Sequence, residues 1–288
     1  MALSRDDTRL VERVRDALVE AGSTFSPDKL RAYERAIKEE RNPRAKWVLE
    51  TILENARVAA RDRSPLCDDT GIPHLLLEIG GGRSLSGEMM AAIREGVREG
   101  LRTLPGRPMA IMGGDWQRID QSGGLDPDPA ALEPAPLLVC PSEDVKRLRL
   151  HVLMFGGGPA IRGRTCRVFH RHSGEVVKDE IVKWATESVE QLGCSPCTLT
   201  IGIGRSQYEA ASLMLQAQAF GSHDVQSEAE REITRRVNES NIGALGLRGD
   251  VSVLSTFLRV GPQRASGVRV VCLRPSCCFE PRHAWVDI

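Results

Sequence analysis

The sequence predicts an α+β fold in which an N-terminal helical bundle, residues 1–64, precedes a mixed sheet flanked by helices, residues 65–288. Apolar residues recur at helical spacing in three successive stretches before residue 62. After residue 65, short apolar runs alternate with helical patterns and glycine-rich turns. A chain of 288 residues can bury a sizeable core, as one large domain or two small ones, without disulfides.

Start and stop signals mark each helix of the N-terminal region. The first helix is expected over residues 5–22, where Gly22 is a natural stop. Ser26-Pro27 and Asn42-Pro43 each place an N-capping side chain before a proline, so they open the second and third helices. The third helix should run to about Arg61. We expect the apolar stripes of these helices to be core, with no ligand role.

The second part of the chain contains the predicted sheet. Strands are expected at residues 72–79, 147–155, 168–171, 198–203, 251–260 and 268–273, and helices at 86–101, 177–192, from 206 onward and at 227–240. Residues 104–136 are rich in Gly and Pro, with Asp126-Pro127-Asp128-Pro129 at their centre. They are typical of a long mobile loop, either a lid or a solvated insertion.

Composition excludes several kinds of partner. Lys and Arg together number 39, as do Asp and Glu, so no net charge favours nucleic acid or an anionic membrane. There is no apolar signal segment and no run of 18 apolar residues, so we expect a cytoplasmic protein. Eight cysteines in a reducing compartment are more plausibly metal ligands or buried thiols than disulfides.

The stretch Cys67-Asp68-Asp69-Thr70-Gly71, the 67–71 motif, lies between a helical pattern and an apolar strand. A thiolate is a soft metal ligand, a carboxylate can transfer protons, and a glycine allows close approach of the backbone. The motif is short, and a buried structural cysteine beside an N-capping Asp-Asp-Thr is the simpler interpretation. Two later stretches, around Cys194 and Cys278, are the reason to look further.

Two other places suit an anion. Arg102 follows a predicted helix and is either an anion clamp or a cation that satisfies the last carbonyls of that helix. Gly156-Gly157-Gly158 follows a strand, so its amides are either an anion cradle, assisted by Arg162 and Arg164, or a simple turn. Gly202-x-Gly204 lacks the third glycine of a dinucleotide site and the Lys-Ser/Thr of a P-loop, so we reject a nucleotide role.

Cys67, Cys194 and Cys278 each lie where a regular element meets a turn, and they are far apart in sequence. Such a distribution suits an iron–sulfur cluster better than structural zinc, which usually takes close-spaced pairs of ligands. Three thiolates on a four-iron cluster leave one iron open as a Lewis acid. A zinc ion on Cys194-x-x-Cys197 and Cys277-Cys278 is the alternative.

Together these motifs resemble the α subunit of the iron–sulfur class I fumarate hydratases and, more closely, of the L(+)-tartrate dehydratases. The resemblance runs from about Lys46 to Ala284 and implies one continuous family domain over approximately residues 1–284. It rests on Cys67-Asp68-Asp69-Thr70-Gly71, which is similar to Cys-Gln-Asp-Thr-Gly, and on Leu101-Arg102, Gly156-Gly157-Gly158 with Gly163-Arg164, Gly193-Cys194-Ser195-Pro196, the segment from Arg236-Val237-Asn238 to Leu247, and Cys278-x-x-x-Arg282.

The resemblance implies a hydro-lyase, a carbon–oxygen lyase that adds or removes water on a small dicarboxylate such as tartrate or fumarate. It implies a [4Fe–4S] cluster on Cys67, Cys194 and Cys278, with Asp69 as the acid/base residue. Arg102, the Gly156, Gly157 and Gly158 amides and, as a weaker candidate, Arg164 would hold a substrate carboxylate. In the family a separate β subunit or C-terminal domain completes the site. We therefore expect a heteromer with a β subunit, and an α chain that is itself dimeric.

This chain departs from the family pattern in ways that leave alternatives open. The Asp-Pro loop replaces an Asn-Thr-Gly-rich segment, Asp68 stands for Gln, and Ser195 stands for Pro. An apparent two-residue insertion leaves Cys277 or Cys272 as alternatives to Cys278 for the third ligand. The alternative function is a non-catalytic or scaffold subunit that retains a cluster or zinc site. The substrate and the direction of the reaction stay open.

Overall fold

The computed structural model describes residues 5–104 and 107–288 of the chain. Contacts between Cα atoms divide the chain into two compact units, which we call unit 1 and unit 2. Unit 1 combines the described parts of Met1–Thr24 and Ala56–Phe155 with Arg282–Ile288, and unit 2 combines Phe25–Asn55 with Gly156–Pro281. Each unit contains one four-stranded sheet, so each is described by its own sheet and helices.

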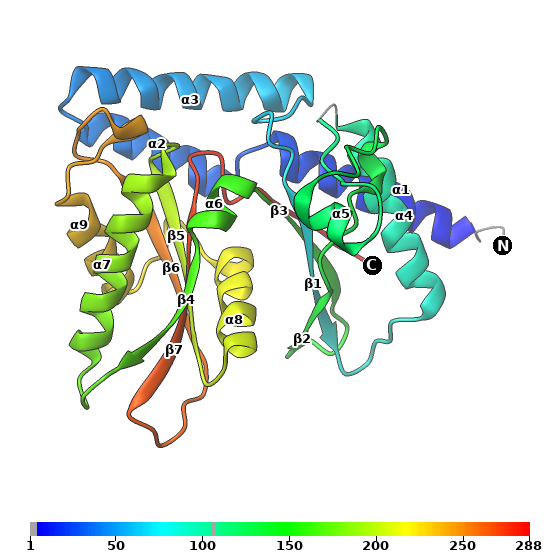
Figure 1. Cartoon of the computed structure of the whole chain (residues 1–288). Helices are drawn as coiled ribbons and strands as arrows, with labels where there is room; N and C mark the ends of the chain where they lie inside the picture. The colour runs from blue at the N-terminus through cyan, green and yellow to red at the C-terminus, as the bar shows by residue number, and fades with distance from the viewer. Residues whose placement is uncertain (1–4, 105–106) are drawn as a thin grey trace. The chain divides into compact units, whose positions relative to one another are not determined.

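Unit 1 is built on a mixed sheet (Figure 1). The strand order is β2 (Leu138–Ser142), β1 (Ile72–Gly80), β3 (Leu148–Phe155) and β8 (His283–Asp287). β1 is parallel to β2 and antiparallel to β3, and β3 is antiparallel to β8. Helix α1 (Arg5–Ser23) contacts β3 and β8, and α4 (Gly87–Thr103) packs beside α1. Alternate strand residues such as Leu77 and Leu150 enter the shared core, because side chains alternate across a strand.

Unit 2 is built on a second mixed sheet, with helices on both faces (Figure 1). The strand order is β4 (Arg164–Phe169), β7 (Val268–Ser276), β5 (Cys197–Gly204) and β6 (Val253–Val260). β5 is parallel to β6 and antiparallel to β7, which is antiparallel to β4. Helices α7 (Gly174–Leu192) and α9 (Glu228–Asn238) cover one face, and α8 (Gln207–Phe220) covers the other.

The glycines of β5 explain how α8 packs. A Cβ atom on Gly202 would collide with the carbonyl oxygen of Ala210, and one on Gly204 would lie 2.7 Å from the Ala210 nitrogen. Helix and strand backbones therefore approach each other closely only because both positions are glycine. Gly202-x-Gly204 thus serves helix–strand packing, in keeping with the rejection of a nucleotide role.

The α+β class is confirmed, and so are the three N-terminal helices. They contribute to two units and not to one shared bundle: α1 packs in unit 1, α2 (Pro27–Glu39) packs in unit 2, and α3 (Pro43–Asp62) includes residues of both. The division at residue 64 remains a prediction about domains. The compact units each combine helices from the first part of the chain with strands from the second.

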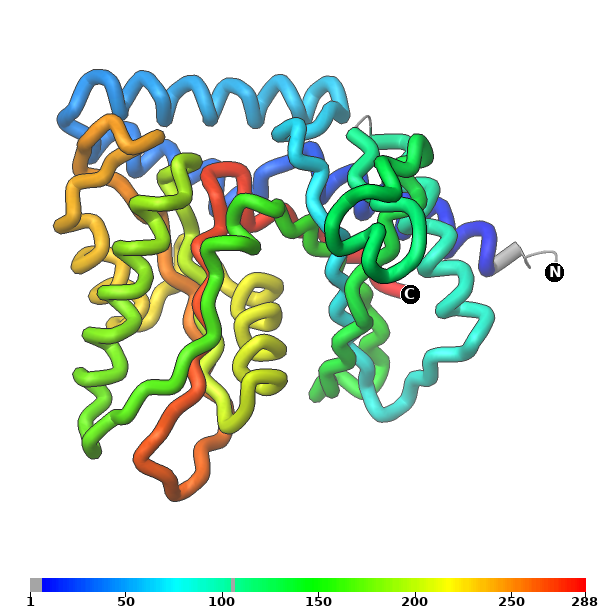
Figure 2. The backbone as a smooth tube through the Cα atoms, in the orientation of Figure 1, coloured from blue at the N-terminus to red at the C-terminus, as the bar shows by residue number. Residues whose placement is uncertain are grey.

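Several short elements were not predicted. They are β2, β8, α6 (Gly157–Arg162), η2 (Ala244–Gly246) and, in the expected loop, α5 (Asp115–Asp120) and η1 (Pro129–Ala131). Figure 2 shows residues 107–136 coiling back on themselves within unit 1, and Pro105 and Gly106 lie outside the described residues. The third predicted strand, at residues 168–171, is also shifted: β4 starts at Arg164, because residues 164–169 pair with β7. The strands β2, β4 and β8 depend on partners distant in sequence, which local patterns do not reveal.

Among residues 5–104 and 107–288, no helix has the length and apolar character needed to cross a bilayer.

Candidate functional site

The 67–71 motif connects α3 to β1 in unit 1. Its first residues are accessible, since Cys67 is half-buried and Asp68 is exposed, whereas Thr70 is only 4% exposed. The Cys67 thiol donates to Asp68 Oδ1 over 3.3 Å, and the preceding Leu66 amide donates to the Gly22 carbonyl at the end of α1 over 3.0 Å. The stop signal of the first helix therefore also positions the entry to the motif.

Arg282 holds the motif from the start of β8. Its Nη1 donates to the carbonyl oxygens of Asp69 and Thr70 over 2.6 and 3.0 Å, and its Nε donates to the Met154 carbonyl over 3.2 Å. The Arg282 side chain is almost wholly buried, so these backbone acceptors satisfy it in place of water. The sequence analysis identified this arginine only as the last residue of the Cys278-x-x-x-Arg282 motif. No sequence pattern indicates that it contacts Asp69.

Gly71 is required by this arrangement. Its φ of 87° lies in the left-handed region, and a Cβ there would lie 2.5 Å from Arg282 Nη2. The Thr70 hydroxyl beside it is buried and has no hydrogen-bond partner among the described atoms. Buried side-chain hydroxyls are usually hydrogen-bonded, so Thr70 is an exception among the described residues. It lies next to Asp69, the predicted acid/base residue, which is half-buried.

Arg102 lies at the end of α4, where the sequence predicts it, but its guanidinium is engaged. Its Nη2 and Nε donate to the two carboxylate oxygens of Asp128 over 2.7 and 3.1 Å. The Arg102 guanidinium and the Ala130 amide hold the pKa of the Asp128 carboxyl below its ordinary value. Farther along, Arg107 reaches Asp68 of the motif at 3.5 Å. Arg107 therefore links the described part of the loop to the 67–71 motif.

Unit 2 brings together the segments that carry Cys194 and Cys278. Gly193, with φ of 76°, ends α7, and Cys194 follows it in an exposed position. The Cys278 amide donates to the Cys194 carbonyl oxygen over 2.8 Å. Cys278 is buried, and its pKa is raised by a hydrogen bond with Cys277, by burial and by the nearby Cys277 and Cys194 thiols, against an opposing effect of Lys29.

The other two candidates for the third ligand differ in setting. Cys277 is half-buried and immediately precedes Cys278, after the end of β7. Cys272 lies within β7, opposite Thr165 of β4 and Gly202 of β5. Cys197, the second member of the Cys-x-x-Cys pair, is wholly buried at the start of β5, and burial raises the pKa of its thiol.

Residues of α2 support the Cys278 backbone, a contribution that the sequence did not indicate. The Tyr33 hydroxyl donates to the Cys278 carbonyl over 2.7 Å. Phe25 stacks on Tyr33 with 5.5 Å between ring centroids, and the wholly buried Lys29 ammonium lies 3.9 Å from the Phe25 centroid. The apolar periodicity of α2 predicts burial of Tyr33 but not of Lys29, and a helical pattern does not reveal which loop these side chains contact.

The Gly156-Gly157-Gly158 stretch is the start of a helix and not a simple turn. Gly156 is the N-cap of α6, and its amide donates to Glu280 Oε1. Glu280 also forms a buried ion pair with Arg274, whose Nη2 donates to the Gly156 carbonyl over 3.2 Å. The backbone at Gly156 is thus held on both sides. Around Gly158 there is open space, since a Cβ there would meet nothing within 4 Å.

The nearby arginines are also engaged. Arg164 Nη1 lies 3.0 Å from Glu187 Oε2 of α7, and Arg162 Nε donates to the Gln191 carbonyl over 3.1 Å. Both therefore fasten α6 and β4 to α7. The predicted site residues are divided between the two units. Unit 1 contains Cys67, Asp69 and Arg102, and unit 2 contains Gly156, Gly157, Gly158, Arg164, Cys194 and Cys278.

A metal ion is not accommodated by any single cluster of donors in the described part of the chain. No group of three or more His, Cys, Asp and Glu side chains there is arranged to hold one. The donor chemistry nevertheless suits soft metal: Cys194 and Cys278 are carried by neighbouring segments of unit 2, and Cys67 is an accessible thiol of unit 1.

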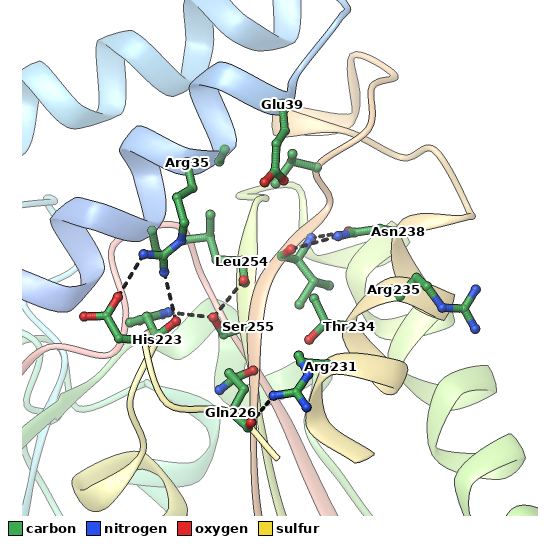
Figure 3. A pocket seen from close by; sticks show the side chains of 15 residues that line it. Arg35, Glu39, His223, Gln226, Arg231, Thr234, Arg235, Asn238, Leu254 and Ser255 are labelled. Carbon is green, nitrogen blue, oxygen red and sulfur yellow. Dashed lines mark hydrogen bonds and ion pairs between the residues drawn. The ribbon is translucent and has the colours of Figure 1, made fainter. Parts of the chain in front are cut away.

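A pocket of about 630 Å³ lies in unit 2 between α2, α9 and β6 (Figure 3). None of its lining residues belongs to the predicted site. Two of its amides complete the edge of the sheet: Gln226 Nε2 donates to the Thr256 carbonyl, and Asn238 Oδ1 accepts from the Val253 amide, over 2.9 and 2.8 Å. Arg35 is paired with Asp224 at 2.8 Å. The polar groups of this pocket therefore have structural tasks, and we assign it no ligand.

Comparison with known proteins gives consistent results. The model of a family described as fumarate hydratase (fumerase) matches residues 11–287. A Methanocaldococcus jannaschii protein named, provisionally, as an L(+)-tartrate dehydratase subunit alpha is 25% identical over 276 residues, which cover 92% of each chain. The L(+)-tartrate dehydratase subunit alpha of Escherichia coli K12 is 25% identical over 257 residues, 86% of this chain and 81% of that protein, as is its Shigella sonnei counterpart.

Proposed function

The chain belongs to the fumarate hydratase family, whose members are hydro-lyases, and from that premise we propose that it adds or removes water on a small dicarboxylate such as tartrate or fumarate. The observation that carries the proposal is the fixed conformation of the 67–71 motif. Arg282 and Gly71 hold its backbone, while Cys67 and Asp69 are only partly buried.

We assign a [4Fe–4S] cluster to Cys67, Cys194 and Cys278. The donor set fits such a group because thiolates are its usual ligands, and because the Cys278 amide is bonded to the Cys194 carbonyl. That bond is the reason to prefer Cys278 to Cys272, which lies within a strand. When bound by three thiolates, the cluster would supply an open iron as a Lewis acid for a carboxylate and a hydroxyl group.

The chain's own residues would orient the substrate and move the proton. Asp69 is the acid/base residue in this proposal, and Arg282 is the positioning residue that sets the direction of its backbone. Arg102 and the Gly157 and Gly158 amides at the start of α6 would hold a carboxylate, with Arg164 as the weaker candidate. Gly156 would act by placing these amides, since its own amide donates to Glu280.

A partner subunit is part of the proposal. The similar proteins are named as alpha subunits, and they match this chain over most of their length. Trans addition of water needs groups on both faces of the reacting bond, whereas the residues assigned here supply one acid/base group and one carboxylate clamp. We therefore propose a heteromer with a separate β subunit, around a dimer of this chain, in the cytoplasm.

The test is anaerobic purification of the chain with its genomic neighbour co-expressed. We expect a brown protein with about four irons per chain and turnover of a C4 or C5 hydroxy acid. Cys67→Ser, Cys194→Ser and Cys278→Ser should each lower the iron content strongly, whereas Cys140→Ser and Cys166→Ser should not. Full iron in Cys278→Ser with loss in Cys277→Ser would reassign the third ligand, and a colourless protein with one zinc would refute the cluster.

One observation favours the alternative of a non-catalytic or scaffold subunit that retains a cluster or zinc site. Arg102 and Arg164 are both paired with internal carboxylates, Asp128 and Glu187. Turnover by the co-expressed complex distinguishes a catalytic subunit from a scaffold subunit. A complex with four irons and no activity on any hydroxy acid or unsaturated diacid would support the alternative.

A further inference from the structure

The carboxylate that pairs with Arg102 belongs to the Gly- and Pro-rich loop expected over residues 104–136. Asp128 lies in the Asp126-Pro127-Asp128-Pro129 stretch, and its two oxygens meet Nη2 and Nε of Arg102 at 2.7 and 3.1 Å. This two-point geometry is the one that a guanidinium uses to recognise a carboxylate ligand. The side chains of Arg102 and Asp128 are 50% and 43% exposed, so solvent reaches both.

Asp128 is held ready for this contact by its own loop. Its amide donates to Asp126 Oδ1 over 2.9 Å, and its Oδ1 accepts from the Ala130 amide over 3.0 Å, which caps η1. The prolines on either side restrict the backbone further, since each has a fixed φ. The Asp128 carboxylate is therefore presented by a preorganised turn.

The loop also contacts the 67–71 motif near its start and strand β1, which follows the motif, near its end. Near its start, Arg107 reaches Asp68 at 3.5 Å, and near its end the Ala135 amide donates to the Pro73 carbonyl over 2.9 Å. The segment between these contacts carries Asp128. The internal carboxylate that pairs with Arg102 thus belongs to a loop that also contacts Asp68 of the motif that we assign to catalysis.

We propose that Asp128 is an internal competitor for Arg102, which the substrate carboxylate must displace, and that Asp128 thereby sets the affinity for substrate. This inference rests on the proposed function, in which Arg102 binds a substrate carboxylate. A ligand that binds only when Arg102 is released from Asp128 has an apparent dissociation constant equal to its intrinsic constant divided by the fraction of molecules in which Arg102 is released. Because an exposed ion pair is weak, the competition should change the dissociation constant by about two- to fivefold.

A structural role for the pair is the rival explanation, and the chain offers a matched control. One helical turn before Arg102, Arg98 Nη2 lies 3.1 Å from Glu133 Oε1 of the same loop, with both side chains about half exposed. If these pairs only fasten the loop to α4, then Asp128→Asn and Glu133→Gln should have the same effect. Asparagine can still cap η1, so Asp128→Asn removes the charge and keeps the turn.

The experiment measures the dissociation constant of succinate, a dicarboxylate with no hydroxyl group to eliminate, by calorimetry on the full chain handled without oxygen. We expect Asp128→Asn to lower this constant about two- to fivefold, and Glu133→Gln to leave it unchanged. Arg102→Gln should weaken binding, and in the Arg102→Gln background Asp128→Asn should have no further effect.

Three outcomes would overturn the proposal. The first is an unchanged or weaker affinity for succinate in Asp128→Asn, and the second is an equal effect of Asp128→Asn and Glu133→Gln on that affinity. The third is that Asp128→Asn raises the affinity for succinate equally in the Arg102→Gln background. Failure to bind succinate even in Asp128→Asn would also overturn it, because the released guanidinium should then accept a carboxylate. The proposed function fails separately: a chain that shows the expected succinate pattern but no hydro-lyase turnover would refute the reaction and not the competition.

Discussion

Two of the arginines in unit 1, Arg282 and Arg102, have opposite properties. Arg282 is 2% exposed and donates to three backbone carbonyls, whereas the Arg102 side chain is 50% exposed and donates to one carboxylate. Releasing Arg282 would leave buried polar groups without partners, which is costly, whereas water or a ligand can replace Asp128 at Arg102 with little loss. The comparison teaches that the buried Arg282 fixes backbone geometry, while the exposed Arg102 is available for exchange.

The largest effect is expected where a buried ion pair is broken. In unit 2, Arg274 and Glu280 are 4% and 0% exposed, and Glu280→Gln would leave the Arg274 charge uncompensated. We expect a loss of about 3–5 kcal/mol in the free energy of unfolding, measured by urea titration. The control is Glu187→Gln, which removes the partially exposed partner of Arg164 and should cost less than about 1 kcal/mol. Equal losses in the two variants would contradict the contrast between buried and exposed pairs.

A second contrast separates buried from exposed histidines. His223 is 6% exposed, and burial, assisted by the nearby Lys29 charge, lowers its pKa to about 3. Unfolded, it binds a proton near pH 6.5, so between pH 6.5 and 3 the unfolded state binds more protons and stability falls as the pH falls. Between pH 6 and 4 the native chain should lose about 2–3 kcal/mol more than His223→Asn does.

The matched control for this prediction is the exposed His172. His172→Asn should keep the acid-dependent loss of stability, because His223 is still present in it. Parallel stability curves for the native chain and His223→Asn over this range would show that His223 is not held neutral.

The contact between Gly71 and Arg282 gives a smaller effect. Gly71→Ala forces a left-handed φ on alanine and pushes a methyl group against Arg282 Nη2, so it should cost about 1–3 kcal/mol of unfolding free energy. It should also lower turnover, because it disturbs the backbone of Asp69. Gly81→Ala is the control, since a Cβ there meets nothing within 4 Å. Unchanged stability and turnover in Gly71→Ala would refute the role of Arg282 in fixing the motif.

The smallest effects are expected for the exposed pairs of α4. Arg98→Gln and Arg102→Gln should each change the free energy of unfolding by less than about 1 kcal/mol, and any loss should shrink at high salt. Thermal unfolding at low and high ionic strength measures the loss of stability and its dependence on salt. A large, salt-independent loss for either variant would show that the pair is part of the packed structure and not an exchangeable surface contact.

Sequence patterns predicted regular elements well and their partners poorly. The start of α2 followed from Ser26-Pro27, since Ser26 is the N-cap and Pro27 is the first residue of the helix. β8 was not predicted, because its five residues become a strand only by pairing with β3. For the site, the cysteines and Asp69 remain predictions made from motifs. Arg282, Glu280 and Tyr33 were not assigned a role there, since their contacts join segments far apart in the chain.

The sequence by itself determined the class of fold, the positions of most helices and strands, and the family, because periodicity, capping residues and short motifs are local properties. Tertiary structure alone decided which charges are engaged. In the folded chain, Asp128 pairs with Arg102, and Glu280 pairs with Arg274 and accepts from the Gly156 amide. Arg282 donates to the carbonyl oxygens of Asp69 and Thr70. No local pattern encodes these choices, because an arginine takes whichever acceptor the fold brings within hydrogen-bonding distance, and burial then decides whether that acceptor can be exchanged.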